Sequence, residues 1–215
     1  MAKKTAKKRV ECTLNKRHLA LTEFVSKDGI RPVLTGVYVD PKRGVAVATD
    51  GFALLEMPLG KLDAGDFPPT AGAGSEPMKE GIIPASAVVA AVKALPKRTA
   101  LPALNNIRLT GDGNGRAALT TNDLEMARDS WVTLIDGTFP NYNQLVPKRL
   151  KRGNKKAREV TLSLAILTKL VRAMAAMGAD MVRLQVTAHD HPVRLDIRYE
   201  DGEAHGVVMP MVTKE

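Results

Sequence analysis

Few side chains in this 215-residue sequence are spaced in a way that suggests catalysis or metal binding. His189 and His191 lie two residues apart, which suits a shared metal ion, but no third ligand accompanies them. Asp50 and Asp136 could form a carboxylate pair for acid–base chemistry. Each precedes a glycine, however, and Asp-Gly is first a turn signal. The loop at 112–115 lacks the ligand spacing and the bidentate glutamate of a calcium site.

Sequence motifs of the common enzyme classes are also missing. The chain contains no HExxH zinc motif, no phosphate-binding loop and no serine nucleophile elbow. Cys12 is the only cysteine, which excludes an internal disulfide and fits a reducing compartment. We therefore predict a protein that is not an enzyme and that uses no metal and no cofactor. A nucleic-acid-modifying enzyme with an unrecognised site stays open as an alternative.

The formal charge of +9 is concentrated in two clusters of basic residues. The first consists of Lys3, Lys4, Lys7, Lys8 and Arg9. The second consists of Lys148, Arg149, Lys151, Arg152, Lys155, Lys156 and Arg158. Without these twelve, 20 basic residues face 23 acidic ones, so the body of the protein is mildly acidic. Clustered positive charge favours a polyanionic partner such as nucleic acid. A solvated tail and a solubilising loop are the alternative interpretation.

Composition also divides the chain. Residues 1–9 are predicted to be a disordered basic arm, and 61–80, rich in glycine and proline, a linker. Residues 148–158 form a basic connector. Between them lie a two-unit part, 10–147, and a half-size part, 159–215.

Three segments repeat one pattern of predicted elements. Each starts with a short strand, at 10–14, 81–84 and 159–162, and continues with a helix. Three strands separated by turn signals follow each helix. The clearest helix follows Ser163, a candidate N-cap, and carries an apolar face that includes Leu164, Leu170 and Val171. The predicted fold class is α+β, with three β-α-β-β-β units and helices on one face of antiparallel sheets.

Three further segments carry apolar and turn residues of a different kind. They are 48–54 (ATDGFAL), 134–142 (LIDGTFPNY) and 207–211 (VVMPM). A proline directly after a strand must end the strand or place it at an edge. Two methionines flank that proline, and methionine forms adaptable surfaces for apolar ligands. Taken alone, 207–211 also fits a buried terminal strand.

Together, and in this order, the three segments resemble signature segments of the bacterial sliding clamp family, the processivity subunits of replicative DNA polymerase. The resemblance implies the DNA-clamp fold and a hydrophobic pocket that takes short peptides from polymerase, clamp loader and repair proteins. Carried over position by position, the pocket residues are Thr49, Gly51, Phe52, Ala53, Leu54, Pro140, Leu145, Val207, Val208, Met209, Pro210 and Met211. The chain departs from the family at Phe52 and Ala53, where His-Arg is usual, which makes the pocket rim less polar.

The resemblance covers the middle domain and the last half-domain of a family subunit, so it implies a shortened clamp, of phage or mobile-element origin. Family rings contain twelve units, and four chains of three units would restore that number. The expected function is a DNA replication factor in the bacterial or phage-infected cytoplasm, a homo-oligomeric ring around duplex DNA. Expected DNA contacts, to phosphates of any sequence, come from the second basic cluster together with Lys93, Lys169 and Arg172. The alternative is a clamp-derived adaptor that binds clamp-ligand peptides, in transcription or replication, without closing a ring.

Overall fold

The computed structural model describes residues 10–63, 76–97, 101–123, 125–146, 160–188, 190–200 and 202–211. The predicted arm 1–9 and connector 148–158 lie outside these ranges, as does 64–75 of the predicted linker. In the ranges described, no helix is long and apolar enough to cross a membrane. The division into a two-unit part and a half-size part stays a prediction.

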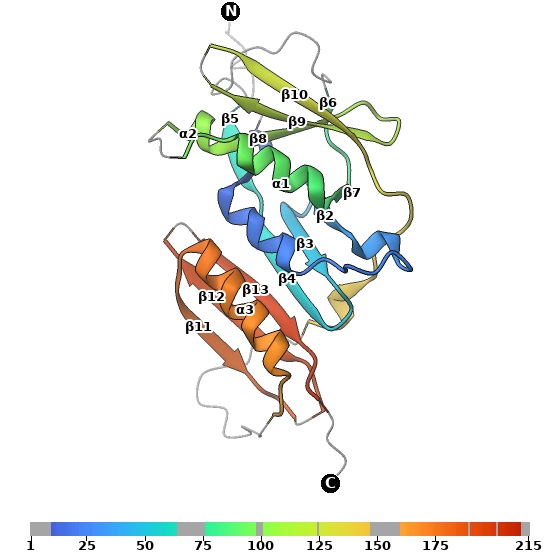
Figure 1. Ribbon diagram of the computed structural model, residues 1–215, viewed down its shortest axis with the longest axis vertical. Coiled ribbons are helices and arrows are strands. Elements are labelled where there is room, and N and C mark those ends of the chain that lie inside the picture. The colour runs from blue at the N-terminus through green and yellow to red at the C-terminus, as the bar shows by residue number, and fades with distance from the viewer. Residues whose placement is uncertain are drawn as a thin grey trace, which may run out of the picture.

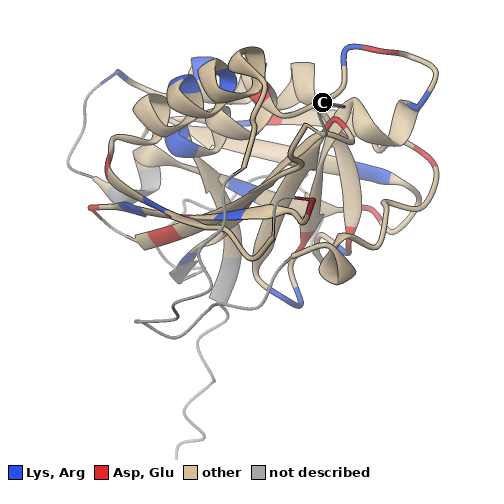
Figure 2. Ribbon diagram, turned by 90° about the horizontal axis from the view of Figure 1, so that it is seen from below, with Lys and Arg blue, Asp and Glu red and all other residues tan. Residues whose placement is uncertain are grey.

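Two antiparallel sheets lie end to end, and helices cover one face of them (Figures 1 and 2). The first sheet has the order β10 (Ala127–Thr133), β9 (Arg116–Asn122), β8 (Asn106–Gly111), β1 (Val10–Asn15) and β5 (Gly60–Asp63), with β6 (Glu76–Pro77) also paired to β8. The second has the order β11 (Ala179–Gln185), β12 (Val193–Tyr199), β13 (Gly202–Val208), β4 (Ala53–Pro58), β3 (Val45–Thr49), β2 (Gly36–Asp40) and β7 (Gly81–Pro84).

Three longer helices cover the sheets: η1 (Lys16–Glu23), which is a 3-10 helix, α1 (Ala85–Ala94) and α3 (Leu164–Met177). Short turns of helix are η2 (Pro32–Leu34), α2 (Pro102–Asn105) and η4 (Tyr142–Gln144). α1 ends before Pro96, since proline has no N–H for a helical hydrogen bond. α3 ends at Gly178, whose φ of 67° is the left-handed conformation that glycine adopts without steric cost.

The predicted three-unit pattern is confirmed for the helices and for the three strands that follow each of them. The first unit is β1, η1, β2, β3 and β4; the second is β7, α1, β8, β9 and β10; the third is α3, β11, β12 and β13. The third unit has no first strand in the part of the chain described here, because residues 160–163 have no assigned secondary structure. The predicted strand at 159–162 is therefore wrong at 160–162.

The first two units complete each other by exchanging their first strands. β1, from the first unit, pairs with β8 of the second, and β7, from the second unit, pairs with β2 of the first. Leu14 lies opposite Ile107 and Ile83 opposite Val37, and all four side chains are fully buried. They belong to one aliphatic core between the sheets and the helices. The exchange makes the two units one packed body.

The third unit joins the first through antiparallel pairing of β13 with β4, where Val207 lies opposite Leu54 and Val208 opposite Ala53. The close approach depends on Gly206, since a Cβ there would lie 2.9 Å from the carbonyl oxygen of Leu54. The pairing makes the first and third units neighbours, and it brings together segments 48–54 and 207–211. The sheet runs continuously from one unit into the other.

Three details of the sequence prediction need correction. The linker at 61–80 does not begin at 61, because Gly60–Asp63 forms β5 beside β1, and Glu76–Pro77 pairs with β8. Ser163 stands at the N-cap position of α3, but its side chain makes no capping hydrogen bond. The buried face of α3 also differs from the predicted apolar face. Leu170, Ala173 and Met177 are buried, whereas Leu164 and Val171 are exposed.

Candidate functional site

A pocket of about 180 Å³ lies where the first and third units meet. Its walls are mostly apolar and come from four separate stretches of the chain. They are formed by Arg31, Leu34, Thr49, Gly51, Phe52, Ala53, Leu54, Pro140, Tyr142, Leu145, Val146, Val207 and Met209. Because β4 and β13 are hydrogen-bonded neighbours, Leu54 and Val207 lie side by side in the pocket floor.

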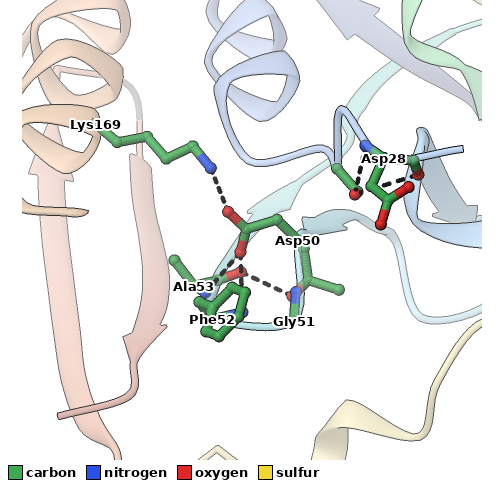
Figure 3. Close-up of polar contacts among 8 residues, drawn as sticks. Asp28, Asp50, Gly51, Phe52, Ala53 and Lys169 are labelled. Atoms are coloured by element: carbon green, nitrogen blue, oxygen red, sulfur yellow. Dashed lines mark hydrogen bonds and ion pairs between the residues drawn. The ribbon is translucent and has the colours of Figure 1, made fainter. Parts of the chain in front are cut away.

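The β3–β4 turn forms one wall and is tightly fixed (Figure 3). The Asp50 carboxylate accepts hydrogen bonds from the backbone N–H groups of Phe52 and Ala53, each at 2.9 Å. The Thr49 hydroxyl donates to the Ala53 carbonyl at 2.7 Å and accepts from the Gly51 N–H at 3.1 Å. Gly51 has a φ of 92°, which a side chain would strain. The turn therefore holds Phe52 at the rim, 67% exposed.

Helix α3 also holds this turn. Lys169 donates to the Asp50 carboxylate across the junction of the third and first units (Figure 3). Burial alone would raise the pKa of Asp50. The hydrogen bonds from Lys169 and from the turn N–H groups, together with the Lys169 charge, outweigh burial and hold the pKa below its usual value. Asp50 thus stays ionised and ties α3 to the pocket wall.

Aromatic rings support the pocket from behind. The rings of Tyr38 and Phe139 are stacked at 4.8 Å, and Tyr142 meets Phe139 edge-on at 6.1 Å. Such pairs add rigidity beyond the area they bury. Phe139 and Tyr142 are packed with Leu54 and Val207 in a small apolar cluster on the side of the sheet opposite the main core.

A buried polar network anchors Tyr142. Its hydroxyl donates to the Glu56 carboxylate at 2.6 Å and accepts from Arg43 at 2.7 Å. Burial raises the pKa of Tyr142, and the bond to Glu56 raises it further. His205 lies 3.2 Å from Glu56, yet burial lowers the pKa of His205 despite that charge. The network thereby ties the β2–β3 turn, β4, β13 and η4 together under the pocket.

The structure brings nine of the twelve predicted pocket residues to this one pocket: Thr49, Gly51, Phe52, Ala53, Leu54, Pro140, Leu145, Val207 and Met209. Val208 points into the main core and is fully buried, because successive strand residues face opposite sides. Pro210 and Met211 follow β13 beyond the pocket wall, with the Met211 N–H donating to the Thr161 carbonyl at 2.8 Å.

Sequence reasoning missed four residues of the pocket wall: Arg31, Leu34, Tyr142 and Val146. Tyr142 closes the 134–142 motif and could have been included on that ground. Arg31 and Leu34 come from the stretch before β2, which carries no motif. Arg31 is exposed and places a positive charge at a rim that was predicted to be less polar than in the family.

The predicted DNA-contacting residues that can be placed lie on helices. Lys93 on α1 and Arg172 on α3 are exposed, and Figure 2 shows basic residues on the helical layer. Lys169 is partly buried and paired with Asp50, so it does not lie free on that layer. Lys148, Arg149, Lys151, Arg152, Lys155, Lys156 and Arg158 lie outside the described residues.

Solved structures with the same arrangement are bacterial sliding clamps. The Helicobacter pylori beta clamp bound to a DNA ligase peptide is 14% identical, with 99% of this chain and 68% of that chain covered and a TM-score of 0.59. The DNA polymerase III beta subunit of Thermotoga maritima is also 14% identical, with 100% and 68% covered and a TM-score of 0.59. The Pseudomonas aeruginosa sliding clamp bound to griselimycin is 15% identical, with 99% and 68% covered and a TM-score of 0.60.

No family model matches the sequence, and no curated protein matches it. The structural likeness shows that this chain has the sliding-clamp fold, and the chain spans about two-thirds of the length of those clamps.

Proposed function

We propose that this protein is a sliding clamp without enzymatic activity, whose pocket holds short peptides of replication and repair proteins. The observation that carries the proposal is the apolar pocket between β4 and β13, built on a clamp fold. One similar clamp was solved with a DNA ligase peptide. The proposed setting is the bacterial cytoplasm, including that of a phage-infected cell.

The chemistry of the pocket defines the peptide. Phe52, Leu145 and Met209 stand at its mouth with 67%, 54% and 38% of their surfaces exposed, so they can cover an incoming apolar side chain. Burial of such anchors supplies most of the affinity in interfaces of this kind. Arg31 at the rim favours an acidic residue beside the anchors. The proposed ligand is therefore an apolar peptide with a neighbouring carboxylate.

Calorimetry with clamp-binding peptides of bacterial polymerase, clamp loader and ligase tests this directly. Leu145→Ala with Met209→Ala should weaken binding at least about tenfold, because each removes an exposed anchor contact. Met126→Ala is the matched control, since Met126 is exposed outside the pocket, and it should leave affinity unchanged. If no peptide binds the unaltered protein, the proposed function is wrong.

The ring and its DNA contacts are part of the same proposal. Lys93 and Arg172 belong to the helical layer, which would line the channel. Binding to duplex DNA should lack sequence preference and fall steeply with salt, because phosphate contacts release counterions. Neutralising Lys148, Arg149, Lys151 and Arg152 together should weaken all sequences alike. Salt-independent or base-specific binding would contradict the proposal.

Four chains of three units would supply a twelve-unit ring. Each chain ends its first sheet at β10 and its second at β11, and such sheet edges pair readily with further strands. β10 is an edge of the first sheet and β11 an edge of the second. In the proposed ring, β10 pairs with β10 of one neighbouring chain and β11 with β11 of the other, and each junction lies on a two-fold axis. Light scattering should give a tetramer. A monomer that binds peptide would favour the adaptor function instead.

A further inference from the structure

The third unit leaves an apolar strand exposed at the edge of the second sheet. Met181, Val182 and Leu184 on β11 are exposed by 56%, 41% and 53%. The corresponding strands of the first two units, β2 and β8, are mostly buried. A shallow groove of about 140 Å³ runs along β11 and its neighbour β12. β11 therefore has the composition of an inner strand in an edge position.

Two of these side chains belong to the core face of the sheet. Val182 lies opposite Ile197 and Leu184 opposite Leu195, and both partners are buried beneath the helical layer. Helix α3 exposes Leu164 by 79% and Val171 by 59% on the same unit. In the described ranges, neither η1 nor α1 exposes a large apolar side chain. The core of the third unit is thus left open on one side.

Segment 160–163 lies directly before α3, where the first strand of a unit would lie. In the first unit, Thr13 stands three residues before η1 and pairs on one side with Gly60, in the strand that follows β4. In the third unit, Thr161 stands three residues before α3, and its carbonyl accepts from Met211, which follows β13. Both segments are therefore hydrogen-bonded to the residues that follow the last strand of their own unit, β4 in the first unit and β13 in the third.

The other side of the two segments differs. β1 also pairs with β8, which belongs to the second unit. Segment 160–163 forms no such ladder in the described part of the chain. The third unit thus has the two parts that a strand exchange needs: a first-strand segment, and β11 with a free edge. In the described part of the chain, it has no second unit with which to exchange strands.

We propose that the missing unit is the third unit of a second copy of this chain. Segment 160–163 of each copy adds to β11 of the other, around a two-fold axis, as β1 and β7 are exchanged within one chain. A second copy fits because it supplies the required segment and the required open edge at once. The exchange keeps the Thr161–Met211 hydrogen bond, as β1 keeps its pairing with β5.

The register of the exchange follows from the pairs inside the chain. In the first two units, the residue just before each helix lies opposite the first residue of the strand that follows the other unit's helix: Asn15 opposite Asn106, and Pro84 opposite Gly36. In β11 the register shifts between Ala179 and Met181, so the regular strand starts at Met181. Ser163 should therefore lie opposite the partner's Met181.

This register matches the two apolar faces. Leu162 falls opposite the partner's Val182, and Val160 opposite the partner's Leu184. Leu162 already packs on the core side of its own unit, as its counterparts Leu14 and Ile83 do. A shift by one residue would turn Val160 and Leu162 to the other face of the sheet. The alternation thus selects one register.

Engineered disulfides test the proposal on the full chain, with Cys12→Ala to remove the natural thiol. Leu162→Cys with Val182→Cys, and Thr161→Cys with Arg183→Cys, place thiols on residues predicted to be opposite. Antiparallel pairs alternate between two geometries, and one of these two pairs has the closer Cβ atoms. At least one should form a reducible dimer under mild oxidation.

A disulfide within one chain cannot give a false signal. Thr161 is hydrogen-bonded to Met211. Val182 pairs with Ile197, which in turn pairs with Ala204, so Val182 and Ala204 lie at the same position along the strands. Seven residues separate Ala204 from Met211, which is about 23 Å along a strand. Disulfides need Cα atoms within about 7 Å. Any disulfide between these positions must therefore join two chains.

The matched control combines Leu162→Cys with Arg183→Cys, which the register places on opposite faces, and it should not form a dimer. Equal cross-linking of the control, or none in either predicted pair, would overturn the exchange. In light scattering, Val182→Glu with Leu184→Glu should halve the assembly mass, whereas Ile30→Glu, exposed by 84% in a loop, should not change it. An unaltered mass for the double variant would also overturn it.

The inference supplies one junction of the proposed ring but does not depend on peptide binding. Peptide affinity is measured at the other end of β13, on the pocket between β13 and β4. A protein that binds peptide and forms no disulfide dimer contradicts the exchange alone. A disulfide dimer that binds no peptide contradicts the proposed pocket alone.

Discussion

The first-strand segment of a unit is paired within a sheet in one region of this molecule and is not paired within a sheet in another. In the first and second units, Leu14 and Ile83 are fully buried because each strand enters the sheet of the other unit. In the third unit, Leu162 occupies the same position relative to its helix and is only partly buried. Burial of these side chains is thus decided by the unit that receives the strand and not by the strand itself.

The largest expected contrast comes from truncating these matched positions. Ile83→Ala should lower the free energy of unfolding by about 3 to 4 kcal/mol, because it empties a closed core. Leu162→Ala should cost less than about 1 kcal/mol in dilute solution. Urea titration at low and high protein concentration measures both. Equal losses at low concentration would remove the distinction between the two regions.

A second contrast concerns the residue that lies opposite the end of the exchanged strand. At Gly36 a Cβ would lie 2.6 Å from the carbonyl oxygen of Ile83 and 2.8 Å from Ile135 Cδ1. Gly36→Ala should therefore cost about 3 kcal/mol through overpacking. The counterpart change in the third unit, Met181→Ala, should stay within about 0.5 kcal/mol in dilute solution. Thermal melting of the two variants would decide; a tolerated Gly36→Ala would contradict the close packing at β2 and β7.

The helix that follows each first strand gives a contrast in pH dependence. Burial lowers the pKa of His18 on η1 to about 4 from 6.5, outweighing the bond to the Pro58 carbonyl. The unfolded chain then binds the proton more tightly, so stability falls as pH drops from about 6.5 towards 4, by roughly 2 kcal/mol. The third unit has Ile166 at this place in α3.

Urea midpoints between pH 7 and pH 4 measure this loss. His18→Gln keeps polar atoms at the site without the titrating ring, so its profile should be flatter over that range. A variant with the same slope as the unaltered protein would show that other groups cause the acid sensitivity.

The smallest expected effect concerns the ion pair between the regions. Lys169→Met removes the charge that holds Asp50, and should cost about 1 kcal/mol because the pair is only partly shielded from water. Arg172→Met, one turn away and exposed, should cost nothing measurable. Peptide affinity of the Lys169 variant should also fall, since the Asp50 turn forms a pocket wall. Identical behaviour of the two variants would mean that the ion pair does not support the turn.

Much of the fold was predictable because its signals are local. Turn residues and alternating apolar positions located the three-strand runs, and local residues also end two helices, since α1 stops before Pro96 and α3 stops at Gly178. Strand exchange was not predictable, since the pairing of β1 with β8 joins residues more than ninety positions apart without a local mark. The same limit explains the failed strand at 160–162: a strand needs a neighbour, and the sequence does not say whether one is present.

The candidate pocket shows the same division. Phe52, Pro140 and Met209 lie in recognisable segments and were predicted to meet. Val208 was included wrongly as a wall residue, although strand alternation with Val207 argues against both facing one pocket. Arg31 and the Lys169–Asp50 pair could not be found in advance, because each depends on how separate elements pack.

The pairing of β4 with β13 has a consequence for how the protein is made. Leu54 and Val207 meet in the pocket although about 150 residues of chain separate them, and contacts so distant in sequence form late in folding. A ribosome-bound chain that has emerged only as far as α3 already contains the Thr49–Ala53 turn, but it lacks the strand that completes the pocket. Under the proposed function, a peptide would therefore bind only to chains whose synthesis has passed β13.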